Sequence, residues 1–125
     1  MEREGGCLCG AVRYRVEGQP YIVGICHCAD CRKESGSSFT SFARWRRDAF
    51  AFSGDIATYA GRSFCPQCGG RLFCLDDDDV EIRFGSLDDA PTQLLPEMEI
   101  WIKRRETWLS PVAGLAQHQE DPPCE

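Results

Sequence analysis

The chain has 125 residues, including nine cysteines, and its 14 basic and 20 acidic side chains give a net charge of −6. The 42% hydrophobic share, with 3 Trp, 3 Tyr and 7 Phe, excludes a disordered tail and a metallothionein-like cysteine sponge. The length predicts one domain over residues 1–125, with a core at about 5–115 and a polar tail at 117–125 that we expect to fray.

Short apolar patterns in this chain predict a mainly β fold. The stretch 29–35 has good helix formers but allows one or two turns at most, because Gly36 would end it. Turn residues at 53–55 predict a hairpin between two of the strands, and the acidic run 76–79 is expected to be a solvated turn. The expected strands, in chain order, cover residues 12–16, 21–25, 39–45, 50–52, 56–59, 71–75, 80–84 and 98–103.

Localisation and partners follow from charge and hydropathy. The N-terminus has no apolar signal segment and no apolar run approaches the roughly 20 residues of a membrane helix, so we expect a cytoplasmic chain without a membrane partner. The negative charge argues against a nucleic acid partner. Disulfides are rare in the cytosol, where clustered cysteines bind metal or carry out redox chemistry.

Four cysteines have the spacing of a closed zinc site. Cys65 and Cys68 form a Cys-x-x-Cys turn, followed by Gly69, which can take the positive φ that such a turn needs. Cys7 and Cys9 supply a second pair, so four thiolates would complete a structural Cys₄ zinc site. A redox dithiol at Cys65 and Cys68 is the rival interpretation, and the absence of a thioredoxin-like βαβ pattern disfavours it.

Three further cysteines, Cys26, Cys28 and Cys31, lie within six residues. Three protein ligands with one open position are typical of a catalytic zinc. The rival is a second structural site closed by Cys74, His118 or a carboxylate, and spacing alone leaves both open. His27, between two of the ligands, is interpreted as an exposed or hydrogen-bonded histidine. The remaining candidates are interpreted as bystanders or core residues: Cys74, Cys124, Trp101 and Trp108.

The motifs together resemble the glutathione-dependent formaldehyde-activating enzyme family, which also includes centromere protein V. The similarity rests on Gly6-Cys7-Leu8-Cys9-Gly10, on Cys26-His27-Cys28-Ala29-Asp30-Cys31 and on Cys65-Pro66-Gln67-Cys68-Gly69. Glu99 stands where members of the family often carry His. The net charge and the lack of a basic tail argue against the chromatin or microtubule binding that centromere protein V would suggest.

The resemblance implies a β-tent fold of small antiparallel sheets around zinc, with one short helical turn after the Cys-His-Cys-x-x-Cys motif. It also implies two zinc ions per chain, a structural one on Cys7, Cys9, Cys65 and Cys68 and an open one on Cys26, Cys28 and Cys31. The implied activity is that of a carbon–sulfur lyase acting on an adduct of glutathione or a related thiol with formaldehyde. The alternative is a non-catalytic zinc-binding module that recognises a protein partner.

Overall fold

The computed structural model describes residues 1–122; Cys124, interpreted above as a tail thiol, lies outside them. Within these residues the chain forms eleven strands in two sheets and one short α-helix, which confirms the mainly β prediction. No helix in this part of the chain is long and apolar enough to cross a membrane.

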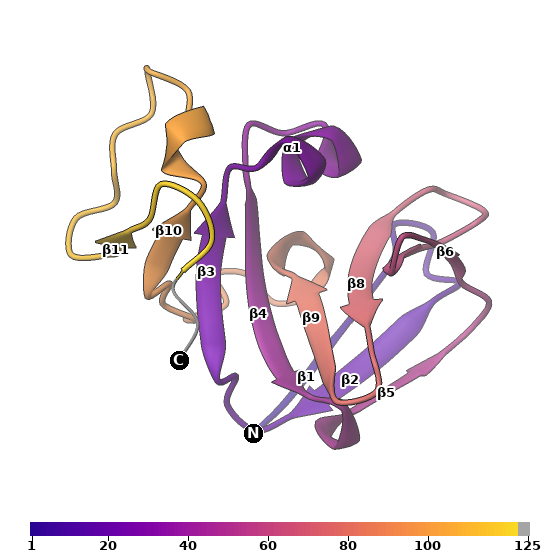
Figure 1. Ribbon diagram of the computed structural model, residues 1–125. Helices are drawn as coiled ribbons and strands as arrows, with labels where there is room; N and C mark the ends of the chain where they lie inside the picture. The colour runs from indigo at the N-terminus through magenta and orange to yellow at the C-terminus, as the bar shows by residue number, and fades with distance from the viewer. Residues whose placement is uncertain (123–125) are drawn as a thin grey trace.

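The smaller sheet has three strands in the order β1-β2-β5 and crosses behind β8 and β9 in Figure 1. Its strands are β1 (Glu2–Gly6), β2 (Arg13–Glu17) and β5 (Phe50–Ser53). Tyr14 and Val16 of β2 are buried while Arg15 between them is exposed, as the alternation of the sequence predicts. β1 was not predicted from sequence.

The larger sheet has eight strands in the order β11-β10-β3-β4-β9-β8-β7-β6. Its pairings are antiparallel except for those of β10, which runs parallel to both β3 and β11. The strands are β3 (Ile22–Cys26), β4 (Thr40–Arg46), β6 (Ala57–Tyr59), β7 (Arg62–Phe64), β8 (Arg71–Leu75), β9 (Asp79–Arg83), β10 (Met98–Ile100) and β11 (Ala116–Gln117).

Helical segments fill the connections between strands. The α-helix α1 (Ala29–Ser35) follows β3 and ends at Gly36, which has the left-handed φ of 70° expected of a helix-terminating glycine. Three single turns of 3₁₀ helix complete the described elements: η1 (Arg47–Ala49), η2 (Phe84–Ser86) and η3 (Ile102–Arg104).

The main core lies between the two sheets. Side chains of β2 and β5 pack against Trp45 of β4, Phe73 of β8 and Ile82 of β9, all at most 2% exposed. A second, smaller core forms around Cys26, Cys31 and Phe42 at the start of α1. The second core therefore contains two of the three clustered cysteines.

Two sequence predictions are wrong. Residues 50–52 and 56–59 do not form a hairpin, because β5 pairs with β2 in the small sheet and β6 pairs with β7 in the large one. Trp108 is 70% exposed and not part of the core. The described part of the tail contacts the body of the chain: His118 and Glu120 accept backbone hydrogen bonds from Ile102 and Trp101 at 3.1 Å each. The fraying of residues 117–125 stays a prediction.

Candidate functional site

Four sulfurs meet where the turn after β1 approaches the turn after β7. The Sγ atoms of Cys7, Cys9, Cys65 and Cys68 all lie within 4.8 Å of one another. The Sγ of Cys9 is 3.6 Å from that of Cys7 and 3.7 Å from that of Cys65. A tetrahedral zinc with Zn–S of about 2.3 Å requires S–S separations of about 3.8 Å. The donor set and its spacing fit a zinc ion.

A glycine closes each of the two turns. The N–H of Gly10 donates to the carbonyl of Cys7, and that of Gly69 donates to Cys65. Both glycines have positive φ, 82° and 74°, which glycine adopts without steric cost. Backbone N–H groups of Cys9 and Gly70 lower the pKa of the Cys68 thiol to about 6. The backbone of the two turns thus favours the ionised form of the Cys68 thiol, which suits a site for a cation.

Three further sulfurs meet at the junction of β3 and α1. Cys26 ends β3, Cys28 is the N-cap of α1, and Cys31 lies in the first turn of that helix. Their Sγ atoms lie within 4.8 Å of one another. The backbone N–H of Cys31 donates to the Sγ of Cys28 at 3.3 Å. Capping of the helix by Cys28 therefore brings these two sulfurs together.

The Cys31 thiol is the acidic member of this group. A hydrogen bond from Cys26 and the positive charge of Arg83 lower its pKa to about 6, while burial acts in the opposite direction. The hydroxyl of Thr40 also lies near the Cys31 sulfur and acts to lower its pKa, yet it makes no hydrogen bond of good geometry. Arg83 and Thr40 are therefore close neighbours of the three-cysteine group.

The three-cysteine group has no fourth protein ligand among residues 1–122. No other Cys, His, Asp or Glu places a ligand atom within 4.8 Å of the three sulfurs. The Sγ of Cys74, one alternative considered above, instead accepts a hydrogen bond from Nη2 of Arg71 at 3.1 Å. His118 does not join the group either. In the described part of the chain, a metal here would keep one position free of protein ligands.

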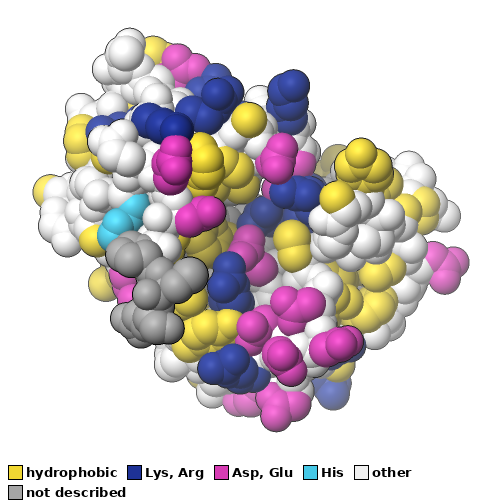
Figure 2. Space-filling view, in the orientation of Figure 1, with side chains coloured by type: hydrophobic (Ala, Val, Ile, Leu, Met, Phe, Trp, Pro, Cys, Tyr) yellow, Lys and Arg dark blue, Asp and Glu magenta, His cyan; other side chains and the backbone are white. Residues whose placement is uncertain are grey.

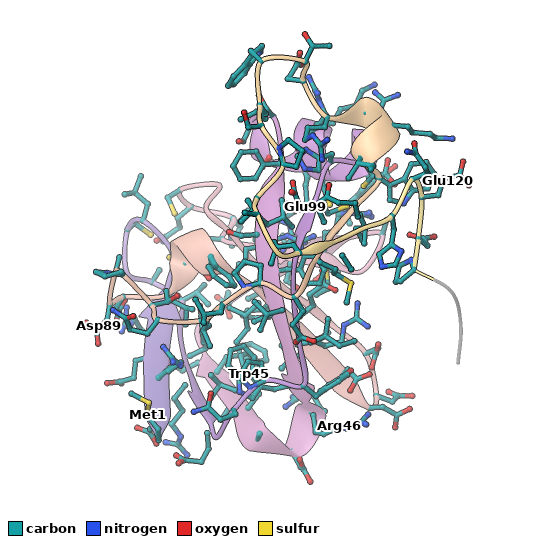
Figure 3. All side chains as sticks on the ribbon, turned by 90° about the vertical axis from the view of Figure 1, so that its left-hand side faces the viewer. Met1, Trp45, Arg46, Asp89, Glu99 and Glu120 are labelled. Atoms are coloured by element: carbon teal, nitrogen blue, oxygen red, sulfur yellow. The ribbon has the colours of Figure 1, made fainter. Side chains whose placement is uncertain are left out.

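His27 is not a member of the three-cysteine group and makes a buried hydrogen bond instead. Its Nε2 donates to Oε1 of Glu99 at 2.8 Å, and both side chains are 2% exposed. The other carboxylate oxygen accepts from the N–H of Val112 at 2.8 Å and from Nε2 of Gln117 at 2.9 Å. Glu99 lies in β10, and Figure 3 shows it beside the segment that leads from η3 to β11, from which Val112 donates to it. His27 is thus a positioning residue, and sequence analysis did not predict its partner.

A pocket of about 330 Å³ opens beside the three-cysteine group. Thr40 lines it and is the register partner of Cys26 in the β3–β4 ladder. Ser35, also in the lining, donates its hydroxyl to the carbonyl of Cys31 at 2.7 Å. Figure 2 shows Lys and Arg side chains in a hollow near the middle of one face, below α1. The lining contains Arg71, Arg83 and Glu34.

Comparison with known proteins settles the family. The family model for the glutathione-dependent formaldehyde-activating enzymes matches residues 2–104. The chain belongs to this family. A curated relative from Halomonas elongata, named "Putative glutathione-dependent formaldehyde-activating enzyme", is 29% identical in an alignment of 126 positions, gaps included, that covers 87% of this chain and 80% of that protein.

Membership of the glutathione-dependent formaldehyde-activating enzyme family confirms the resemblance seen in the cysteine motifs. Both cysteine groups and the pocket beside the second group lie within the matched residues. Both groups could hold metal ions. The part of the site that sequence analysis missed is the polar lining of the pocket, chiefly Thr40, Arg71 and Arg83.

Proposed function

We propose that the chain is a zinc-dependent carbon–sulfur lyase that forms and cleaves an adduct of glutathione, or a related thiol, with formaldehyde. The observation that carries the proposal is the three-cysteine group, whose sulfurs can surround one ion while no fourth ligand is present among residues 1–122. Membership of the glutathione-dependent formaldehyde-activating enzyme family supports the choice of thiol and aldehyde.

The reaction needs no oxidant or reductant. In the forward direction a bond forms between the thiol sulfur and the formaldehyde carbon, the C=O double bond becomes a single bond, and the thiol proton ends on the new hydroxyl oxygen. The reverse direction breaks the same C–S bond. Zinc at the open site would lower the pKa of the substrate thiol and so favour its nucleophilic form at neutral pH.

The chain's own residues divide into two roles under this proposal. Cys26, Cys28 and Cys31 would hold the open zinc, and their mutual placement follows from β3 and the capped first turn of α1. Cys26 and Cys31 are 5% and 7% exposed, which excludes water from that side of the site.

The second role is structural and belongs to Cys7, Cys9, Cys65 and Cys68. They would hold a closed zinc that joins the turn after β1 to the turn after β7. Cys65 has no exposed surface and packs in the main core. A four-thiolate site of this kind has no position left for a substrate.

Exchange spectroscopy of glutathione with formaldehyde tests the activity. We expect the zinc-loaded protein to accelerate exchange between free glutathione and its hydroxymethyl adduct above the uncatalysed rate. Cys28→Ser should return the rate to the blank. Cys74→Ser is the matched control, because Cys74 lies outside both groups, and it should exchange like the wild type. A wild-type rate equal to the blank would show that the substrate assignment is wrong.

The alternative of a non-catalytic zinc module predicts a closed second site. Cobalt replacement separates the two functions, since an added thiol changes the charge-transfer spectrum only where it can reach the metal. We expect 2-mercaptoethanol to change the spectrum of the cobalt-loaded protein. A spectrum that does not respond would favour the interaction module.

A further inference from the structure

Trp101 has a backbone conformation that large side chains rarely adopt. It directly follows β10, and its φ of 58° and ψ of 39° lie in the left-handed region that favours glycine. A bulky residue stays in this region only where its surroundings hold it, and residues held in this way cluster at functional sites. The contacts of Trp101 therefore indicate what its conformation achieves.

Trp101 lies at the edge of the three-cysteine group. Ile100, the residue before it, is the register partner of Cys26 in the β10–β3 ladder, and the carbonyl of Ile100 accepts the N–H of His27 at 3.1 Å. Trp101 therefore leaves β10 beside the turn from Cys26 to Cys28. Its half-buried side chain packs against the second core, which contains two cysteines of the group.

Residues 118–121, here called the C-terminal strap, hold Trp101 in this position. The backbone N–H of Trp101 donates to the carbonyl of Glu120 at 3.1 Å, and its indole N–H donates to Oδ1 of Asp121 at 2.8 Å. The ammonium of Lys103 lies 5.1 Å from the indole centroid and also pairs with the Glu120 carboxylate. Figure 1 shows the strap, in yellow, crossing in front of β10. Both the backbone and the side chain of Trp101 are thus fixed by the strap.

The strap is itself anchored on the segment that carries Trp101. The N–H of His118 donates to the carbonyl of Glu99 at 2.9 Å, and the carbonyl of His118 accepts the N–H of Ile102 at 3.1 Å. These two bonds flank Trp101 on either side in the sequence. The strap therefore holds the whole turn at the end of β10 and not the indole alone.

The indole lies near the least buried cysteine of the group. Cys26 and Cys31 are buried, whereas Cys28 is only half-buried, so the group is most accessible on its Cys28 side. Cys28 and Trp101 pack against the same buried cluster. The hydrophobic shell around a metal site controls the access of solvent to the metal. A large aromatic ring at this edge covers more of the site than a smaller side chain would.

We propose that Trp101 is a positioning residue that shields the open metal site on its Cys28 side, and that the C-terminal strap sets the position of the indole. The left-handed conformation is tolerated because it places the ring against the second core. A metal in the three-cysteine group is then reached from the pocket that Thr40 lines and not past the indole. The inference rests on the proposed function only for a metal with one open position.

Transfer of zinc to a coloured chelator tests the shield without any thiol or aldehyde. The zinc-loaded protein is mixed with 4-(2-pyridylazo)resorcinol, and the absorbance records the loss of each ion. The first phase belongs to the three-cysteine group if Cys28→Ser lacks it. We expect Trp101→Ala to accelerate this phase at least about tenfold, the order of effect of altering groups around a metal site. The phase from the four-cysteine group should be unchanged.

Variants of the strap test its part in the shield. Asp121→Ala removes the acceptor of the indole N–H and should accelerate the first phase several-fold, whereas Asp121→Asn keeps an oxygen acceptor and should behave like the wild type. Asp121 is exposed, so this pair decides the proposal even where Trp101→Ala fails to fold. Trp108→Ala is the matched control, because Trp108 is 70% exposed and lies outside the second core, and it should transfer zinc like the wild type.

Several results would overturn the shield. These are a first phase in Trp101→Ala no faster than in the wild type, equal rates in Asp121→Ala and Asp121→Asn, and equal acceleration of both phases, which indicates general loosening of the fold. A single phase shared by both ions would also overturn it, because neither ion is then shielded separately.

The same measurements separate the shield from the proposed function. Faster zinc transfer in Trp101→Ala, without accelerated glutathione–formaldehyde exchange in the wild type, would retain the shield and remove the activity. Accelerated exchange in the wild type, with equal zinc transfer in all variants of Trp101 and Asp121, would retain the activity and remove the shield.

Discussion

His27 and Glu99 are bonded to each other in the interior, with 2.8 Å between Nε2 and Oε1 and 2% exposure of each side chain. His27 lies between two cysteines of the three-cysteine group, and Glu99 lies in β10. The backbone N–H of His27 also donates to the carbonyl of Ile100 at 3.1 Å. The segment that carries Cys26 and Cys28 is therefore fixed to β10 by both backbone and side chain.

Replacement of Glu99 by alanine should destabilise the fold strongly. Burial acts to raise the pKa of Glu99, but the hydrogen bonds from Gln117, Val112 and His27 outweigh it and keep the carboxylate ionised. Its loss leaves three donors unpaired in the interior, and we expect the free energy of unfolding to fall by about 3 kcal/mol. Urea unfolding of the zinc-loaded wild type and variant measures this difference in the free energy of unfolding.

Glu97→Ala is the matched control for Glu99→Ala. Glu97 is exposed and lies just before β10, so its replacement should change the free energy of unfolding by no more than about 0.5 kcal/mol. Equal effects of the two substitutions would contradict a structural role for the His27–Glu99 pair.

The two cysteine groups should respond differently to loss of one ligand. Cys65→Ser should unfold or aggregate the chain, because a structural zinc contributes roughly 10 kcal/mol or more to the folding of small domains. Cys28→Ser should leave a folded protein that has lost one metal ion. Circular dichroism together with metal content per chain distinguishes these outcomes. Identical behaviour of the two variants would contradict the assignment of one structural and one open metal site.

A chelator should remove the two metal ions in sequence. The three-cysteine group supplies three protein ligands and the four-cysteine group four, so we expect the ion in the first to leave at a lower chelator concentration. The first equivalent should be lost without change in the far-ultraviolet circular dichroism, and the second together with unfolding. A single step, in which both ions leave as the chain unfolds, would be evidence against independent sites.

Local features of the fold were accessible from the sequence. Alternating residues in β2 and β9 predict strands because one face of each is buried, and Gly36 predicts the end of α1. The grouping of seven cysteines follows from their spacing in the sequence. For two pairs, Cys7 with Cys9 and Cys65 with Cys68, the glycines beside them also shape the turns. Such features depend on few neighbouring residues.

Features that depend on distant partners were missed. β1 carries mainly charged residues and glycine, and it forms a strand because β2 pairs with it. The sequence predicts that the strands of Phe50 and Ala57 form one hairpin. Instead β5 pairs with β2 in the small sheet, and β6 pairs with β7 in the large sheet. Arg83 follows Ile82 directly and is still buried, because Glu34 of α1 and Glu81 neutralise it. No local pattern encodes these pairings.

The helix α1 offers a matched test of buried against exposed charge. Asp30 and Glu34 both contact arginine side chains, but Asp30 is 74% exposed and Glu34 only 9%. Glu34→Ala leaves Arg71 and Arg83 without their shared carboxylate, so the free energy of unfolding should fall by about 3–5 kcal/mol. Asp30→Ala should cost about 0.5 kcal/mol or less, since solvent screens its pair with Arg62 at 3.4 Å. Thermal and urea unfolding of both variants measure the difference, and similar losses would show that Glu34 does not hold the buried arginines in place.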